Sequence, residues 1–412
     1  MKVKAWLAAI CATYIILAGW YAAVIPFGQA PDESAHLPYV AYLFEKKSLP
    51  VFSAKGGSYE FHQPPLYYAL AVPAFALSGA NQARSYLAVR WVTILMGLGV
   101  IIATYALVRE TFPQRTSLAL AAAAFSAFLP MHVALCASVT NDILAEIIFA
   151  CVMLLCVVGL RRGWSVRTAA LAGALTGLGL LAKSAAAPLL MIGWLALFLG
   201  HTKQGRPAWK PLILCLISFT AAALAVSGWW LARNQVLYGD VFAAGVFMEA
   251  FKGRPTPDFF FQRGFSLAGY LLFWVGRYTF ASSWGVFGNM DVFMPWWIYV
   301  ALGVLCVISA AGVVRFLLSW KRLDIWHRQA LMLLGFSLLL ELVVFLRFNM
   351  AFFQAQARYL FPVLPVWAML ICLGLGQWAG KRRTIVELAP GAVALIVAVA
   401  ALPLWIEPRL VG

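Results

Sequence analysis

The stretch "AWLAAICATYIILAGWYAAVIPFGQAPDESAH" (residues 5–36) joins a long apolar run to a polar turn. The run from Ala5 to Phe27 carries no charge, and about 20 apolar residues are enough for a helix to cross the hydrocarbon layer of a membrane. The whole chain has this character: 63% of its 412 residues are hydrophobic and only 11% are charged. We therefore predict an integral membrane protein built from helices, because a helix satisfies its own backbone hydrogen bonds in lipid.

Apolar runs between charged or turn-rich breaks predict an all-α polytopic membrane protein with about 11 transmembrane helices. The first run follows Lys2 and Lys4 and is longer than the apolar region of a signal peptide, so we interpret it as a retained anchor. The predicted spans are residues 5–26, 86–108, 116–137, 142–160, 168–182, 184–200, 211–231, 296–315, 329–347, 359–379 and 385–405.

The loop charges predict the orientation of these spans. A net charge of +16 would suggest nucleic acid for a soluble protein, but in a membrane protein Lys and Arg gather in cytoplasmic loops. Basic residues cluster in alternate loops, at 109–115, 161–167, 201–210, 315–328 and 381–383. We therefore predict a multi-pass plasma (inner) membrane protein with a cytoplasmic N-terminus, an acidic outer face and no nucleic-acid partner.

Two of the outer connections are long, at residues 27–85 and 232–295. Both contain short amphipathic or apolar stretches rich in Tyr and Trp, a composition typical of helices at the membrane interface. We predict a single transmembrane domain over residues 1–412, with no separate soluble domain.

Asp32 and Glu33 stand directly after Pro31, one step outside the first span. Two carboxylates at the start of a helix commonly cap backbone N–H groups and complement the helix dipole. Ionisable residues at a membrane surface are costly, however, and tend to mark function. We therefore take both carboxylates as candidate catalytic residues and keep the capping role as the alternative.

Further polar residues in the first outer loop are candidates for substrate binding or support. His36 and His62 could join Asp32 and Glu33 in a metal site, but their spacing matches no standard ligand pattern, so a divalent metal is not supported and hydrogen-bonding roles are preferred. Gln63 follows His62 in "HQPPLYY" (62–68), where two prolines fix a bend that directs Tyr67. An aromatic anchor at the interface is the alternative for Tyr67.

The predicted fourth span begins with a second polar group. Asn141 and Asp142 stand at its outer start, and Glu146 lies one turn further in on the same face. Asn141 could simply cap the helix. Glu146 needs a cavity or a partner, because a carboxylate inside a span is costly.

Three basic residues lie just below the outer surface: Lys183 between two short spans, Arg233 after a pair of tryptophans, and Arg358 at the start of the tenth span, with Gln356 beside it. Snorkelling to lipid headgroups is one role for such residues. Binding of a lipid-borne phosphate is the other, since Arg can hold phosphate with two hydrogen bonds.

The motifs that carry these residues, in chain order, resemble the GT-C superfamily of polytopic glycosyltransferases that use lipid-phosphate-linked sugars. The nearest branch is the protein mannosyltransferase and aminoarabinose transferase type, similar to glycosyltransferase family 39. The resemblance extends over residues 31–365 and rests on "PDESAH" (31–36), "HQPPLYY" (62–68), "TND" (140–142), "LLAKSAA" (180–186), "WWLARNQVLYGD" (229–240), "SSWGVFGNMDVFMP" (282–295) and "QARYLFPVLP" (356–365).

The resemblance implies a mechanism. An acidic residue of the first outer loop, here Asp32 with Glu33 as its neighbour, would be the general base, and Lys183, Arg233 and Arg358 would hold the phosphate of a polyprenyl-phosphate-sugar donor. It further implies inversion at the anomeric carbon and transfer to an acceptor hydroxyl on the outer face. Many relatives continue into further spans or a soluble domain, whereas this sequence ends soon after Trp405, so no acceptor-recognition role is carried over from such a domain.

The sequence leaves the sugar unnamed, and the acceptor could be protein, lipid or polysaccharide. The main alternative is a polytopic transporter or flippase for a lipid or solute of the cell envelope. Glu341, deep in the ninth predicted span, fits that alternative, because transporters place charged residues near the midplane.

Overall fold

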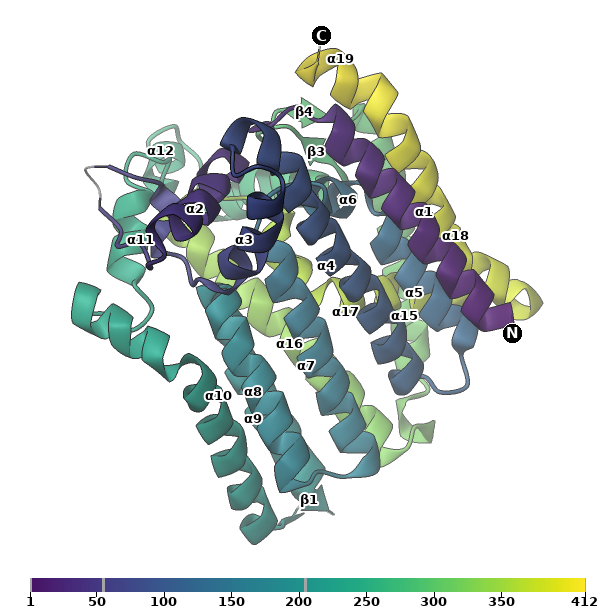
Figure 1. Ribbon diagram of the computed structural model, residues 1–412. Coiled ribbons are helices and arrows are strands. Elements are labelled where there is room, and N and C mark those ends of the chain that lie inside the picture. Colours follow the sequence, from purple (N-terminus) through teal and green to yellow (C-terminus); the bar gives the residue numbers. More distant parts are fainter. Residues whose placement is uncertain (1, 54–55, 204–205, 412) are drawn as a thin grey trace.

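The computed structural model describes residues 2–53, 56–203 and 206–411, and these are almost entirely helical (Figure 1). The long bundle is made of helices α1 (Lys2–Val24), α4 (Gln82–Thr111), α5 (Thr116–Phe128), α6 (Pro130–Cys136), α7 (Asp142–Arg162), α8 (Val166–Ala182), α9 (Pro188–His201), α10 (Trp209–Tyr238), α15 (Trp296–Leu317), α16 (Ile325–Ala351), α17 (Leu364–Gly376) and α18 (Arg383–Ala401).

Shorter elements connect these helices. The first long connection holds α2 (Glu33–Lys46), η1 (Tyr59–His62) and α3 (Leu66–Leu77). The second holds α11 (Ala244–Ala250), α12 (Pro257–Phe261), α13 (Leu267–Gly269), η3 (Tyr270–Gly276), α14 (Arg277–Trp284) and the antiparallel strands β3 (Val286–Phe287) and β4 (Val292–Phe293). The others are η2 (Ser184–Ala186), strands β1 (Thr202–Lys203) and β2 (Arg206–Pro207), η4 (Trp320–Arg322), η5 (Ala357–Val363), η6 (Gly380–Arg382), η7 (Leu402–Ile406) and α19 (Glu407–Leu410).

The predicted polytopic helical architecture is confirmed. Within the described residues, nine helices are long and apolar enough to cross a membrane, and a tenth span results if α5 and α6 are counted together. That pair covers the predicted span 116–137 but bends by 62° at Leu129, where Pro130 cannot donate a backbone hydrogen bond. Helix α8 is apolar but only 17 residues long, so the total of eleven stays a prediction.

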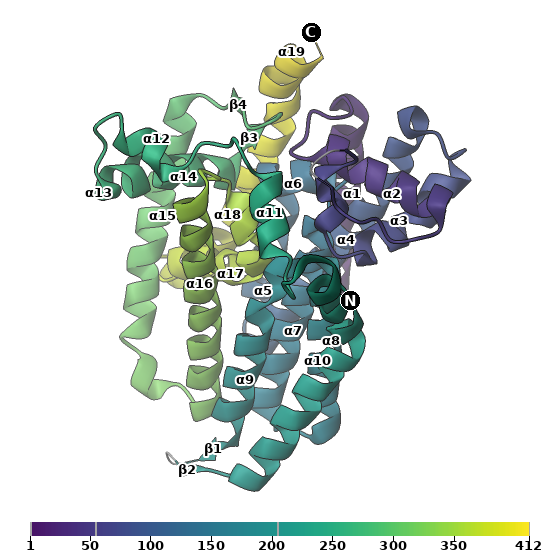
Figure 2. The same ribbon diagram turned by 90° about the vertical axis from the view of Figure 1, so that its left-hand side faces the viewer.

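Both long connections lie at one end of the bundle. Figure 1 shows α2, α3, α11, α12 and the β3–β4 strands together there, with β1 at the opposite end. In the turned view of Figure 2, α2 and α3 stand on one side of this end, α12–α14 on the other, and α11 between them. Segments that are far apart in sequence therefore meet at the end of the bundle that carries α2.

Small residues allow close helix packing at some crossings. A Cβ at Gly173 of α8 would lie 2.0 Å from the backbone oxygen of Phe219 in α10, and one at Gly177 would lie 2.6 Å from that of Ala223. Only glycine fits at such distances, in the small-xxx-small pattern of membrane helices. Helix α8 is thereby fixed against α10, and its last residue precedes Lys183.

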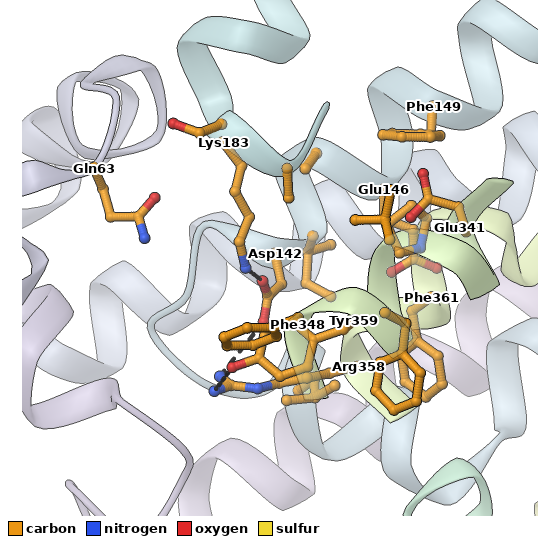
Figure 3. A pocket seen from close by; sticks show the side chains of 18 of the residues that line it. Gln63, Asp142, Glu146, Phe149, Lys183, Glu341, Phe348, Arg358, Tyr359 and Phe361 are labelled. Atoms are coloured by element: carbon orange, nitrogen blue, oxygen red, sulfur yellow. Dashed lines mark hydrogen bonds and ion pairs between the residues drawn. The ribbon is translucent and has the colours of Figure 1, made fainter. Parts of the chain in front are cut away.

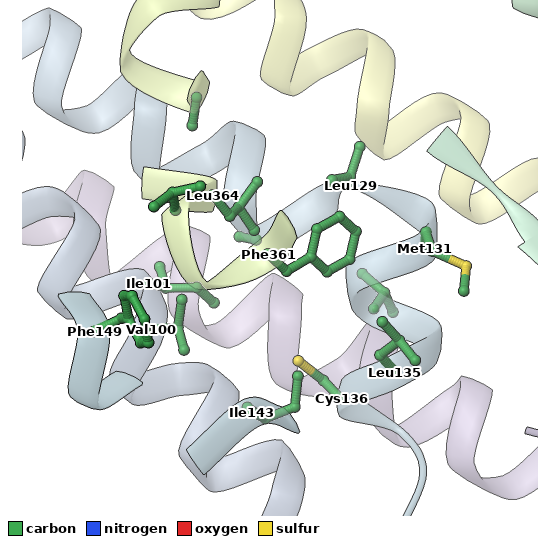
Figure 4. Packing of buried hydrophobic residues seen from close by; sticks show 14 of the residues in the cluster. Val100, Ile101, Leu129, Met131, Leu135, Cys136, Ile143, Phe149, Phe361 and Leu364 are labelled. Atoms are coloured by element: carbon green, nitrogen blue, oxygen red, sulfur yellow. The ribbon is translucent and has the colours of Figure 1, made fainter. Parts of the chain in front are cut away.

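A buried apolar core lies directly beneath the end that carries α2. Figure 4 shows side chains of α4, α6, α7, η5 and the start of α17 packed together, with Phe361 beside Leu129 at the α5–α6 bend. Phe361 is only 2% exposed, so its packing anchors the η5 turn that carries Arg358.

Candidate active site

Asp32 lies in the turn before α2 with its backbone in the left-handed region, at φ 61°, a conformation that Asp tolerates better than most residues. It occupies the N-cap position of α2, yet its side chain makes no capping hydrogen bond. Instead, Tyr59 Oη donates to Asp32 Oδ1 and Arg358 Nη2 donates to Asp32 Oδ2. Burial alone would raise the pKa of Asp32, but the charge of Arg358 and the hydrogen bond from Tyr59 outweigh it and hold that pKa below its usual range. The carboxylate is therefore ionised.

Arg358 links Asp32 to a second carboxylate. Its Nη1 lies 3.6 Å from Asp142 Oδ2, and Lys183 Nζ donates to Asp142 Oδ1. Figure 3 shows Asp142 between Lys183 and Arg358. Four elements contribute to the cluster: the turn before α2, the start of α7, the break after α8, and η5. Two carboxylates and two cations alternate along this cluster, so the formal charges of the four side chains sum to zero.

A cavity of about 360 Å³ opens beside Lys183 and Arg358. Most of its wall is apolar and aromatic, including Phe149, Phe345 and Phe348. The predicted site residues in its lining are His62, Gln63, Asp142, Glu146, Lys183 and Arg358, together with Glu341 from the transporter alternative. We call this the aromatic cavity.

A second cavity of about 210 Å³ lies on the other side of Arg358. Its lining is more polar, and we call it the polar cavity: Pro31, Asp32, Phe251, Arg254, Asn289, Met290, Gln354, Gln356 and Arg358. Arg358 is the residue common to both linings. The structure thus places the candidate base in one cavity and a cation at the boundary with the other.

Glu33 lies outside both linings. It is fully buried and paired with Arg90, whose Nε and Nη2 donate to the two carboxylate oxygens at 2.7 Å each. The backbone N–H groups of Gly28 and Val139 also donate to this carboxylate. These contacts tie the first long connection to α4 and to the segment before α7.

Two further first-loop candidates form hydrogen bonds that hold the loop together. His36 Nδ1 lies 2.8 Å from Tyr68 Oη, and Tyr67 Oη lies 2.8 Å from Thr93 Oγ1 and accepts from the Thr140 N–H. Burial lowers the pKa of His36 to about 4, although Asp32 and Asp142 oppose this shift. Its ring is therefore neutral near pH 7.

His62 and Gln63 reach the lining of the aromatic cavity. Burial likewise lowers the pKa of His62 to about 4, and its Nδ1 is 2.5 Å from the Tyr59 carbonyl oxygen. No group of three or more His, Cys, Asp or Glu side chains in the described part of the chain is arranged to hold a metal ion.

Asn141 positions the start of α7 rather than capping it. Its side-chain Nδ2 donates to the Ala182 carbonyl oxygen at 3.2 Å and to Gln63 Oε1 at 3.4 Å, and it makes no capping bond. This contact holds the residue before Lys183 against the residue before Asp142. One turn along, Glu146 Oε1 lies 3.3 Å from His132 Nε2.

Arg233 is not brought together with the other two cations. Its Nη2 donates to the Pro50 carbonyl oxygen at 2.6 Å, its guanidinium lies over the Trp230 ring, and it lines neither cavity. Of the three predicted phosphate ligands, Lys183 and Arg358 therefore lie together, next to Asp142.

Sequence reasoning missed several residues of the cluster. Tyr59 lies three residues before His62, the first residue of the "HQPPLYY" motif, and no local pattern indicated that it reaches Asp32. Glu60 is buried next to it, and burial together with the charge of Asp32 raises the pKa of Glu60 to about 8. Gln354 in the polar cavity could have been found from its position two residues before Gln356.

The arrangement of spans, two long connections and a charged cluster at one end is the GT-C-like fold that the sequence predicted. Solved structures show the same fold. The crystal structure of ArnT from Cupriavidus metallidurans bound to undecaprenyl phosphate superposes with a TM-score of 0.60, 18% identity and coverage of 97% of this chain and 65% of that one. The oligosaccharyltransferase from Archaeoglobus fulgidus in the apo form superposes with a TM-score of 0.56 and 15% identity. The match covers 97% of this chain and 55% of that one.

The match to a sequence family covers a smaller part of the chain than the match to these structures. Residues 62–230 match the family described as dolichyl-phosphate-mannose-protein mannosyltransferase. No curated protein matches the chain. The chain spans no more than about two thirds of the length of these solved structures, so their similarity shows the fold alone.

Proposed function

We propose that this protein is an inverting glycosyltransferase that moves a sugar from a polyprenyl-phosphate-linked donor to an acceptor hydroxyl on the outer face of the membrane. One observation carries the proposal: the Asp32 carboxylate contacts Arg358, which stands between the polar and the aromatic cavity. A base and a phosphate-binding cation are thereby adjacent at the depth where a lipid-linked donor would present its phosphate.

The aromatic cavity suits the lipid part of such a donor. Its Phe side chains offer a surface for apolar chains, whereas Lys183 and Arg358 at its edge offer charge-assisted hydrogen bonds to a phosphate. The similar ArnT was crystallised with undecaprenyl phosphate. We carry this ligand over as the class of donor and leave the sugar open.

The proposed step is a single displacement. Asp32 takes the proton from the acceptor hydroxyl as its oxygen forms a bond to the anomeric carbon. The bond from that carbon to the phosphate oxygen breaks, and the polyprenyl phosphate leaves with the electron pair. Arg358 and Lys183 stabilise the charge on the leaving phosphate. Attack from the face opposite the phosphate inverts the anomeric centre, as in inverting glycosidases.

The outer-face assignment rests on the loop charges. The cluster lies at the end of the bundle that carries α2, and the β1–β2 strands, next to Lys210, lie at the opposite end (Figure 1). Since basic loops favour the cytoplasm, the cluster would face outward in the plasma (inner) membrane. The acceptor, whether protein, lipid or polysaccharide, would approach from that side.

A transporter or flippase is the second candidate, favoured by Glu341. This residue is 3% exposed, lines the aromatic cavity, and its Oε1 has no hydrogen-bond partner among the described residues. Reconstituted vesicles decide between the two candidates. A transporter would move undecaprenyl phosphate across the bilayer and lose this flux in Glu341→Gln, whereas a glycosyltransferase would show no such dependence.

Replacing Asp32 by Asn tests the enzyme directly. We expect Asp32→Asn to abolish transfer of labelled sugar from a lipid-linked donor in purified membranes, while the folded protein still binds undecaprenyl phosphate. Near-normal turnover by this variant would contradict the proposal.

A further inference from the structure

The polar cavity carries two glutamines that the proposed reaction does not use. Gln354 and Gln356 line it beside Asp32 and Arg358, and Gln354 is only 9% exposed. Carboxamides both donate and accept hydrogen bonds but carry no charge. They are therefore suited to a neutral ligand with hydroxyl groups and add nothing to the binding of a phosphate charge.

The backbone that carries these glutamines is fixed from three sides. The Phe353 N–H donates to the Pro255 carbonyl oxygen at 2.7 Å, the Gln354 N–H donates to Asn349 Oδ1 at 3.0 Å, and the Ala357 N–H donates to Ser282 Oγ at 2.9 Å. The second long connection, the end of α16 and α14 thus all hold the segment in place. Precise readout of hydroxyl positions requires such a rigid support.

One hydrogen-bond acceptor of the two glutamine side chains has no partner among the described residues. Gln356 Nε2 donates to Gln354 Oε1 at 3.1 Å, whereas Gln356 Oε1 is buried and has no hydrogen-bond partner among the described residues. A buried polar atom without a partner is unfavourable and calls for an explanation, of which a ligand is one. Gln356 Oε1 can accept from a ligand hydroxyl, and the Gln354 amide can donate to a second one.

The size and the walls of the cavity narrow the ligand class. At about 210 Å³ it is smaller than the roughly 300–1,000 Å³ of typical small-molecule pockets, which suits one sugar ring. Phe251 and Met290 supply an apolar wall for the C–H face of a ring, and Asn289 adds a further carboxamide. The polyprenyl chain is better matched by the aromatic cavity on the other side of Arg358.

We propose that the polar cavity is a monosaccharide subsite in which Gln354 and Gln356 read the hydroxyls of a single sugar ring next to Asp32. This inference rests on the proposed function, because it assigns part of the same site. The ring could belong to the donor sugar or to a sugar at the end of the acceptor. Both sources present the same hydroxyl chemistry, so the experiment has to separate them.

The test compares Gln354→Leu and Gln356→Leu with Gln329→Leu as the matched control. Gln329 is also partly buried and hydrogen-bonded, to the Leu199 carbonyl oxygen, but it stands at the start of α16 and lines neither cavity. The probes are bare undecaprenyl phosphate and undecaprenyl phosphate carrying mannose, glucose or arabinose. Binding to the purified protein and the KM values of transfer are measured.

If the ring is the donor sugar, both cavity variants should bind the preferred sugar-bearing lipid about tenfold more weakly, the loss expected for one hydrogen bond, and bind bare undecaprenyl phosphate as the wild type does. If the ring belongs to the acceptor, donor binding should stay unchanged and the KM for the acceptor should rise about tenfold. The control should change neither quantity. Gln356→Asn, which keeps the carboxamide, covers the case in which a leucine variant fails to fold.

Two results would overturn the subsite. The first is that the glutamine variants lose affinity equally for bare and for sugar-bearing undecaprenyl phosphate. The second is that both variants keep the wild-type donor affinity and the wild-type KM for the acceptor. Failure of the proposed function looks different: the wild type would then bind undecaprenyl phosphate no better than undecaprenol, whatever the glutamine variants do.

Discussion

Arg358 donates a hydrogen bond to the Asp32 carboxylate and lies 3.6 Å from the Asp142 carboxylate, so the candidate base and a candidate phosphate ligand are bonded to each other. Both carboxylate oxygens of Asp32 are hydrogen-bonded, since Tyr59 donates to the oxygen that Arg358 does not contact. A phosphate that binds Arg358 would compete with Asp32 for the guanidinium. Donor binding would thereby free a carboxylate oxygen and make Asp32 a stronger base.

This competition predicts that the donor binds before the acceptor. We expect bare undecaprenyl phosphate to inhibit competitively against the donor and noncompetitively against the acceptor in initial-rate measurements. Competitive inhibition against both substrates would indicate random binding and would contradict the coupling through Arg358.

Replacing Arg358 by Gln should lower kcat/KM by roughly 10²–10³-fold, because it removes one charge that stabilises the leaving phosphate. Arg358→Lys should recover only part of this loss, since an ammonium group cannot reproduce the two-pronged contact of a guanidinium. Transfer assays with a saturable lipid donor measure both. Equal activity of the Lys variant and the wild type would show that charge alone suffices.

Tyr59 should act on the acidity of Asp32. Its hydrogen bond helps to hold the pKa of Asp32 low, so Tyr59→Phe should raise that pKa. Because transfer needs ionised Asp32, the acidic limb of the pH–rate profile should move to higher pH, whereas kcat near pH 7, where Asp32 is ionised in both proteins, should change little. An unshifted limb would mean that Tyr59 serves only to pack the loop.

Glu33 and Asp32 are neighbours in sequence but have different partners, Arg90 for Glu33 and Arg358 with Tyr59 for Asp32. Glu33→Gln would leave Arg90 as a buried charge without its carboxylate, which typically costs about 3–5 kcal/mol. We expect a lower thermal midpoint of the purified protein. The double variant Glu33→Gln with Arg90→Met should regain part of the loss, because it no longer buries an unpaired charge. A stable but inactive Glu33→Gln protein would instead support the catalytic role predicted from the sequence.

The span pattern and the identity of most cluster residues could be predicted from the sequence, because the lengths of apolar runs and carboxylates at the ends of those runs are local signals. The pairing of these residues could not. Asp32 and Arg358 are 326 positions apart in sequence. Arg233 looked equivalent to Arg358 in sequence, but in the folded chain its guanidinium donates to the Pro50 carbonyl oxygen. Glu33 resembled Asp32 for the same reason: its partner Arg90 stands on α4, where nothing nearby in sequence marks it as a buried counter-ion.

Glu60 should make stability depend on pH. Burial raises its pKa to about 8, helped by the charge of Asp32 and opposed by Lys183 and Arg358. Between the ordinary Glu value of about 4.3 and pH 8, the folded protein retains a proton that the unfolded chain has lost, so stability falls as the pH rises through this window. Glu60→Gln cannot titrate and should flatten the decline. Thermal midpoints of the wild type and the variant between pH 5 and 8 measure the difference, and parallel curves for the two proteins would show that Glu60 is ionised throughout.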